Sequence, residues 1–186
     1  SEFVAALGGT RGRRGSTLAS GGPVIVRDLS SAPVPHLTAE RLTALATLVA
    51  ERTLEQQRIV SESDELIDEL KRADVIVIGL PMYNFGVPST LKAYFDHVAR
   101  AGVTFRYTAA GPVGLLTGKK AYVFATRGGR YAGTAADFQT AYVRQFLGFV
   151  GIRDVEFVYA EGLALGADVR GTAVAHALAR IGQLAA

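Results

Sequence analysis

The sequence predicts an α/β fold: a doubly wound parallel sheet with helices on both faces, formed by one domain that spans residues 1–186. Short apolar, β-branched runs alternate along the chain with segments of helical periodicity, as they do in strand–helix–strand units. Two of these runs, 74–79 and 121–125, are hydrophobic at nearly every position. Such runs are typical of parallel strands that are covered on both faces.

The individual elements follow from these runs and from the spacing of the apolar residues between them. Strands are expected at residues 24–26, 74–79, 121–125 and 155–159, and helices at residues 62–73, 134–150, 169–184 and from Ser89 onward. In the helix at 62–73, Leu66, Ile67 and Leu70 share one face, while charged residues occupy the other. Ser89 follows a proline and is the expected N-cap of its helix.

The composition excludes several classes of protein. Hydrophobic residues make up 49% of the chain and charged residues 20%, which does not fit intrinsic disorder. The net charge of +3 arises within residues 8–22, which hold arginines and no acid. The remainder is neutral, so no basic face is expected for nucleic acid. Residues 8–22, rich in Gly, Arg and Ser, are expected to form a flexible loop.

The absence of cysteine excludes disulfides, thiolate metal sites and cysteine nucleophiles. No apolar run reaches the roughly 18–20 residues that a membrane span needs, and no signal peptide opens the chain. We therefore expect a soluble, cytoplasmic protein without a membrane partner.

Two loops, at 80–88 and 126–133, follow buried strands, and ligands of doubly wound sheets bind beyond the carboxyl ends of the strands. In the first loop, two prolines and a glycine keep the backbone irregular, so its amides are available to a ligand. Tyr83 and Phe85 flank Asn84, a combination that suits a planar heterocycle. The alternative is a rigid turn whose aromatic side chains fill the core.

The second loop contains the pair Gly128 and Gly129 directly after a strand. Glycines let the backbone approach a ligand closely, and exposed amides there suit carbonyl or imide oxygens. The alternative is simply a tight exit from the strand.

No pattern of residues indicates hydrolytic or metal chemistry. His36, His97 and His176 have no second ligand at helical or metal-site spacing, and we expect them on surfaces or helix faces. Asp96 and His97 are neighbours in one helix and do not face each other. An enzyme with this sequence would therefore take its reactivity from an organic cofactor.

The segments MYNFGVPSTLKAYFD (82–96) and RAGVTFRY (100–107) closely resemble the FMN-dependent NADH:quinone oxidoreductases, also called FMN-dependent azoreductases. The resemblance continues through residues 116–120, 126–129, 146–152 and 160–162, and it covers roughly residue 24 to the C-terminus. A match of this length in one register is far more specific than a single short motif.

The resemblance implies a flavodoxin-like fold with five parallel strands, and a homodimer that binds FMN in a site shared by both subunits. The residues that would wrap the isoalloxazine and ribityl groups are Met82, Tyr83, Asn84 and Phe85. The residues on the pyrimidine side would be Thr126, Arg127, Gly128 and Gly129, with Tyr131 close by. Phe105 and Phe149 would form the aromatic walls of the substrate slot, one of them donated by the partner subunit.

The activity implied by the resemblance is a ping-pong transfer of hydride from NADH or NADPH through FMN to quinones and azo compounds. The protein would stack, orient and tune the flavin. The alternative is a flavodoxin-like electron carrier or a flavin-binding interaction protein without NADH turnover. The neutral charge outside residues 8–22 favours the enzyme, because carriers usually present an acidic face to their redox partner.

The N-terminus departs from the family. Its members begin with a strand, then a serine-bearing loop that holds the FMN phosphate, then a helix, and residues 1–7 resemble only the later part of that helix. We therefore expect the first strand and the phosphate loop to be missing from this chain. Ser16 and Ser20 precede a strand rather than a helix N-terminus, so they are poor substitutes as phosphate ligands.

Overall fold

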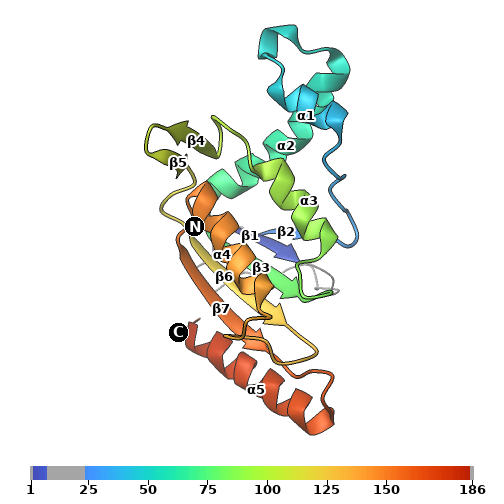
Figure 1. The fold of residues 1–186 in the computed structure, drawn as a ribbon, viewed down its shortest axis with the longest axis vertical. Coiled ribbons are helices and arrows are strands. Elements are labelled where there is room, and N and C mark those ends of the chain that lie inside the picture. Colours follow the sequence, from blue (N-terminus) through green and yellow to red (C-terminus); the bar gives the residue numbers. More distant parts are fainter. Residues whose placement is uncertain (1, 8–23, 185–186) are drawn as a thin grey trace.

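A five-stranded sheet lies at the centre of the protein, and helices pack against it (Figure 1). The computed structural model describes residues 2–7 and 24–184. The strands in this part of the chain are β1 (Glu2–Leu7), β2 (Val24–Asp28), β3 (Ala73–Pro81), β4 (Phe105–Thr108), β5 (Gly111–Gly114), β6 (Lys120–Thr126) and β7 (Asp154–Ala160). The helices are α1 (Ala39–Ala46), the 3-10 helix η1 (Val49–Glu51), α2 (Leu54–Arg72), α3 (Ser89–Val98), α4 (Phe138–Val150) and α5 (Ala167–Leu184).

The strand order is β2-β1-β3-β6-β7, and every pair in this sheet is parallel. The chain passes from β1 outward to β2, and then crosses back past β1 to β3, β6 and β7. The direction of winding therefore reverses between β1 and β3, the position at which doubly wound sheets bind their ligands. Strands β4 and β5 pair separately as an antiparallel hairpin. The predicted doubly wound α/β fold is confirmed.

Helices cover both faces of the sheet, as the alternation of side chains along β7 shows. Phe157 and Tyr159 face α4: the Arg144 guanidinium lies over the Phe157 ring, and Thr140 Oγ1 is 3.1 Å from the Tyr159 hydroxyl oxygen. Val158 lies between them and points to the opposite face, and it is nevertheless buried. Helix α5, which runs along β7 in Figure 1, covers that second face.

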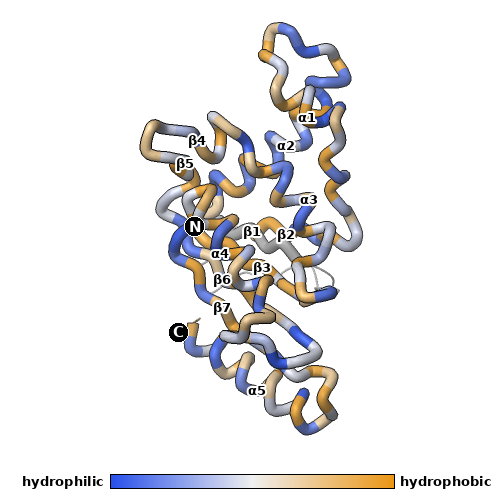
Figure 2. The backbone as a smooth tube through the Cα atoms, in the orientation of Figure 1, coloured by the Kyte–Doolittle hydropathy of each residue, from blue (hydrophilic) through white to orange (hydrophobic). Residues whose placement is uncertain are grey.

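The main core lies between the sheet and the helices α2, α3 and α4. Along α2 the tube in Figure 2 changes between hydrophilic and hydrophobic colours, and the inward residues Leu66, Ile67 and Leu70 are buried as predicted. Phe95 of α3 stacks on Phe146 of α4 with ring centroids 4.0 Å apart. This burial against the sheet stabilises helices whose outer faces are charged.

Strand β1 corrects the prediction that the first strand is missing. Residues 2–7 are not the end of a helix: they form an interior strand of the sheet, with Val4 in register with Ile25 of β2 and with Ile76 of β3. Ala and Leu are strong helix formers, which favours the helical interpretation locally, but residues 3–7 pair with both β2 and β3 and so use their backbone groups in the sheet. Residues 8–22, where a flexible loop is predicted and where Ser16 and Ser20 lie, are outside the described residues, so the prediction that the phosphate loop is missing stays a prediction.

The other strands are confirmed with small extensions, and the helix starts differ for identifiable reasons. Helix α2 begins at Leu54 rather than at 62, because Thr53 and Gln56 form a capping box with bonds of 3.2 and 3.0 Å. Helix α4 begins at Phe138 rather than at 134, because Asp137 accepts the Thr140 amide. The N-cap of α3 is Pro88 and not Ser89. Among the described helices, none is long and apolar enough to cross a membrane.

We expect Leu91→Ala to lower the free energy of unfolding by about 2–5 kcal/mol, because Leu91 is fully buried and its truncation leaves a cavity. Urea denaturation followed by circular dichroism measures this loss. The matched substitution Leu54→Ala, at a side chain that is 84% exposed, should change the free energy by no more than about 0.5 kcal/mol. Equal losses at the two positions would contradict this account of the core.

Candidate functional site

Two loops meet beyond the carboxyl ends of β3 and β6. The Met82 amide donates to the Thr126 carbonyl at 3.0 Å, which continues the β3–β6 pairing into both loops. The Phe85 and Tyr131 rings meet edge to face with centroids 5.7 Å apart. The structure thus brings together the nine residues predicted to bind FMN, although they come from two distant segments.

The first loop contains a two-residue hairpin turn. Tyr83 and Gly86 exchange backbone hydrogen bonds of 3.1 and 2.9 Å, and the two residues between them have positive φ, 47° at Asn84 and 65° at Phe85. Asparagine tolerates this conformation, but a phenylalanine there is strained. Strained backbone of this kind persists where the surroundings hold it, and it is concentrated at binding and catalytic sites.

This turn displays aromatic surface to solvent. Tyr83 is 54% exposed and Phe85 is 52% exposed. The alternative interpretation, in which these side chains fill the core, is therefore wrong for both rings. Such rings offer flat apolar area to a planar ligand.

The second loop is built around one oxygen of Glu161, the residue that follows β7. Glu161 Oε1 accepts bonds from the Tyr131 amide at 2.9 Å, the Ala132 amide at 2.9 Å and Arg127 Nη1 at 3.0 Å. A second set of bonds closes the base of the loop, from the Gly162 amide to the Gly129 carbonyl and from the Arg127 amide to the Ala160 carbonyl. The loop is therefore held from behind by the segment after β7.

Arg127 lies in the interior rather than at the ligand side of the loop. Its side chain has no exposed surface, and its Nη2 donates to Asp137 Oδ1 at 2.9 Å and to Thr140 Oγ1 at 2.8 Å. The guanidinium also lies over the Tyr159 ring at 4.9 Å. Burial opposes ionisation of Asp137, but the hydrogen bonds from Arg127 and Thr140 outweigh it and lower the pKa of this carboxyl.

Several backbone amides at the site have no acceptor. Within the part of the chain that the structure describes, the N–H groups of Asn84, Phe85, Gly128, Gly129 and Arg130 donate to no backbone or side-chain group. The Tyr131 ring packs over Gly129: a Cβ there would lie 2.8 Å from the ring, which would have to shift to admit a larger residue. Free amides beside flat rings can bind the edge of a planar ligand that carries carbonyl oxygens.

The predicted substrate walls lie apart from the two loops of the same chain. Phe105 is buried and packs on Phe149 with centroids 4.3 Å apart. Phe149 lies near the end of α4, ten residues beyond Gln139 at its start, which at 1.5 Å per residue is about 15 Å away. Figure 1 shows the β4–β5 hairpin on the far side of α4 from the ends of β3 and β6. The structure does not bring Phe105 and Phe149 to the loops.

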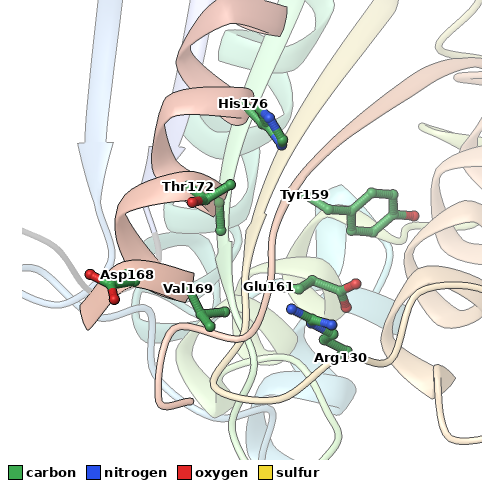
Figure 3. A pocket seen from close by; sticks show the side chains of 8 residues that line it. Arg130, Tyr159, Glu161, Asp168, Val169, Thr172 and His176 are labelled. Carbon is green, nitrogen blue, oxygen red and sulfur yellow. The ribbon is translucent and has the colours of Figure 1, made fainter. Parts of the chain in front are cut away.

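A cavity of about 490 Å³ lies behind the second loop, between β7 and α5. Its lining residues are Arg130, Tyr159, Glu161, Asp168, Val169, Thr172, Ala173 and His176. Figure 3 shows Asp168 and Val169 in the first turn of α5, and Thr172 and His176 farther along the same helix. Among the described residues, no group of three or more His, Cys, Asp or Glu side chains is arranged to hold a metal ion.

The histidines do not enter the loops. His97 is buried rather than on a surface, its Nε2 lies 3.0 Å from the Pro35 carbonyl oxygen, and desolvation lowers the pKa of its ring. Sequence reasoning missed three residues that organise the site: Asp137, Gln139 and Glu161. Of these three, only Asp137 could have been found from the local sequence, because an acid three residues before Thr140 is a typical helix N-cap.

A doubly wound sheet with free amides and exposed rings beyond the ends of β3 and β6, next to its switch point, is the architecture of proteins that bind ligands beyond the strand ends. The comparison with known families agrees: residues 16–185 match the family described as having a flavodoxin-like fold. A solved azoreductase from Bacillus anthracis superposes with a TM-score of 0.88 at 24% identity, covering 100% of this chain and 98% of that one.

Relatives are more similar in sequence. An FMN-dependent NADH:quinone oxidoreductase of Cellvibrio japonicus is 57% identical over 145 residues, 78% of this chain and 73% of that protein. One of Burkholderia pseudomallei is 59% identical over 157 residues, 84% of this chain and 79% of that protein. The chain therefore belongs to the FMN-dependent NADH:quinone oxidoreductase family with the flavodoxin-like fold, and it is an oxidoreductase. The resemblance seen in the sequence is confirmed.

Arg127→Met should lower the free energy of unfolding by about 3–5 kcal/mol, because Asp137 and Glu161 would lose the partner of their buried charges. Chemical denaturation at neutral pH measures the loss. Arg106→Met changes an exposed arginine in the same way and should alter stability by no more than about 0.5 kcal/mol. An Arg127→Met protein as stable as the parent would show that the network is dispensable.

Proposed function

We propose that this oxidoreductase binds FMN at the two loops and uses it to pass hydride from NADH to quinones and azo compounds in a ping-pong sequence. The observation that supports this most directly is the pairing of free amides with exposed rings beyond the ends of β3 and β6. The relatives' names state FMN and NADH:quinone activity, and a structural neighbour from Bacillus anthracis is a complex with FMN. Use of NADPH in place of NADH stays a prediction.

The residues present fit the ring portion of FMN. The amides of Gly128, Gly129 and Arg130 suit the carbonyl and imide edge of the isoalloxazine, and the turn from Tyr83 to Gly86 offers the aromatic surface beside it. Arg127, with a buried side chain, would act by holding its loop and not by direct contact with the ligand. Ser16 and Ser20, which the sequence marks as poor phosphate ligands, lie outside the described residues, so no phosphate ligand is assigned.

Bound FMN supplies the two-electron chemistry. The protein's contribution is positional: Met82 and Thr126 keep the two loops in register, and Glu161 binds the amides of Tyr131 and Ala132. The amides of 128–130, which precede them, have no acceptor among the described residues and are available to the ligand. Amides and aromatic side chains that are already in place would hold the flavin ring in one orientation, so the reacting groups need not be oriented anew at each turnover. In this proposal the electron donor and then the acceptor bind at the same place beside the flavin ring. A ping-pong sequence follows, because the oxidised donor must leave before the acceptor can bind.

A homodimer with a shared site is part of this proposal. The exposed Tyr107 lies beside Phe105, with ring centroids 5.4 Å apart, on a hairpin remote from the loops of its own chain. A second copy would have to bring such an aromatic wall to the slot, as the resemblance implies. The cytoplasmic location and the absence of nucleic-acid and membrane partners stay predictions.

Anaerobic addition of NADH to the FMN-loaded protein should bleach the yellow flavin absorbance, and later addition of a quinone or an azo dye should restore it. Steady-state double-reciprocal plots should be parallel lines, because the donor product leaves before the acceptor binds. Protein that binds FMN but is not bleached by NADH, and that accumulates one-electron-reduced flavin with other reductants, would instead be an electron carrier.

A further inference from the structure

Gln139 hydrogen-bonds to both loops of the candidate site. Its side chain is fully buried on the first turn of α4. Nε2 donates to the Pro81 carbonyl at 2.9 Å and to the Gly86 carbonyl at 3.2 Å, while Oε1 accepts from Arg127 Nε at 3.2 Å. One carboxamide thus connects both ends of the segment 81–86, called here the 81–86 turn, to Arg127, the first residue after β6.

The orientation of this carboxamide is determined by its partners. Both hydrogens of Nε2 point to carbonyl oxygens, which only accept, and Oε1 faces a guanidinium N–H, which only donates. A reversed amide would place Oε1 against two carbonyl oxygens and leave Arg127 Nε without an acceptor. The three partners therefore fix which end of the carboxamide donates and which accepts.

The turn needs such a restraint. Asn84 and Phe85 both have positive φ, and the hydrogen bonds between Tyr83 and Gly86 close the turn on itself without attaching it to the rest of the protein. The attachments on one side are the end of β3 and the Met82 amide. On the other side, the chain runs through Val87, which packs against the core, into α3, and the bond from Gln139 attaches the far end of the turn itself at Gly86.

We propose that Gln139 is a positioning residue of the flavin site, setting the spacing between the 81–86 turn and the 126–131 loop so that both can contact one planar ring. This inference rests on the proposed function. Gln139 itself would not touch the ligand, because its carboxamide is buried and engaged with three protein groups. Its effect passes through the carbonyls of Pro81 and Gly86 and through Arg127.

The test is Gln139→Met, which keeps the length of the side chain and removes its donors and its polar acceptor. In the FMN-free protein, amide resonances should shift in both loops, including those of Asn84 and Gly128, and not only around α4. FMN affinity should fall about 10–100-fold, as is typical when a supporting partner of a binding group is lost. Riboflavin affinity should fall by the same factor, and the visible circular dichroism of the bound flavin should change.

The matched control is Gln57→Met, at an exposed glutamine of α2 that bonds only its own helix start. It should leave FMN affinity within about twofold of the parent. All affinities are measured well below the melting temperature of each variant, so that loss of folded protein does not count as loss of binding. Unchanged FMN affinity and flavin spectra in Gln139→Met would reduce Gln139 to a structural role and overturn the proposal.

If Gln139→Met does not fold, Gln139→Glu carries the test. That substitution keeps an acceptor for Arg127 and removes the donors to Pro81 and Gly86, so weaker FMN and riboflavin binding is again expected, and unchanged binding again overturns the proposal. The proposed function and the inference about Gln139 are refuted by different results. Parent protein that binds no FMN refutes the proposed function and this inference with it, whereas parent and variants that bind FMN equally refute the inference alone.

Discussion

The guanidinium of Arg127 is a charge without exposed surface, and the candidate site depends on how that charge is satisfied. Asp137, Thr140 and Gln139 come from α4 and its cap, while Glu161 follows β7. A buried arginine is tolerated only when such partners surround it, because the cost of removing it from water is several kcal/mol. The pairing therefore fixes α4, the end of β7 and the second loop relative to one another.

That arrangement explains how the strained turn after β3 can persist. A phenylalanine at positive φ is disfavoured by roughly 1–2 kcal/mol, and the turn is held by bonds that lead back through Gln139 to Arg127. The Phe85 ring then rests against Tyr131 of the second loop. The strained first loop and the rigid second loop together present free amides and rings beyond the ends of β3 and β6.

The sequence predicted the parts of this arrangement that are local. Buried parallel strands can be predicted from continuous apolar runs. Ligands of doubly wound sheets bind beyond the carboxyl ends of these strands, which locates both loops. Strand β1 could not be predicted, because its Ala and Leu residues suit a helix as well, and only pairing with β2 and β3 decides between the two. Gln139 was missed because its partners at Pro81 and Gly86 lie 58 and 53 residues away. Arg127 was found, but spacing alone does not tell whether a side chain after a strand points outward or into the core.

The central claim is that one planar ligand lies across both loops. Amide-resolved hydrogen exchange of the protein with and without FMN tests it most directly. The account predicts that FMN slows exchange at Gly128 and Gly129 together with Asn84 and Phe85, because these amides have no acceptor in the described protein. Protection confined to the cavity beside α5, at Thr172 and His176, would contradict it and move the ligand to the other side of the second loop.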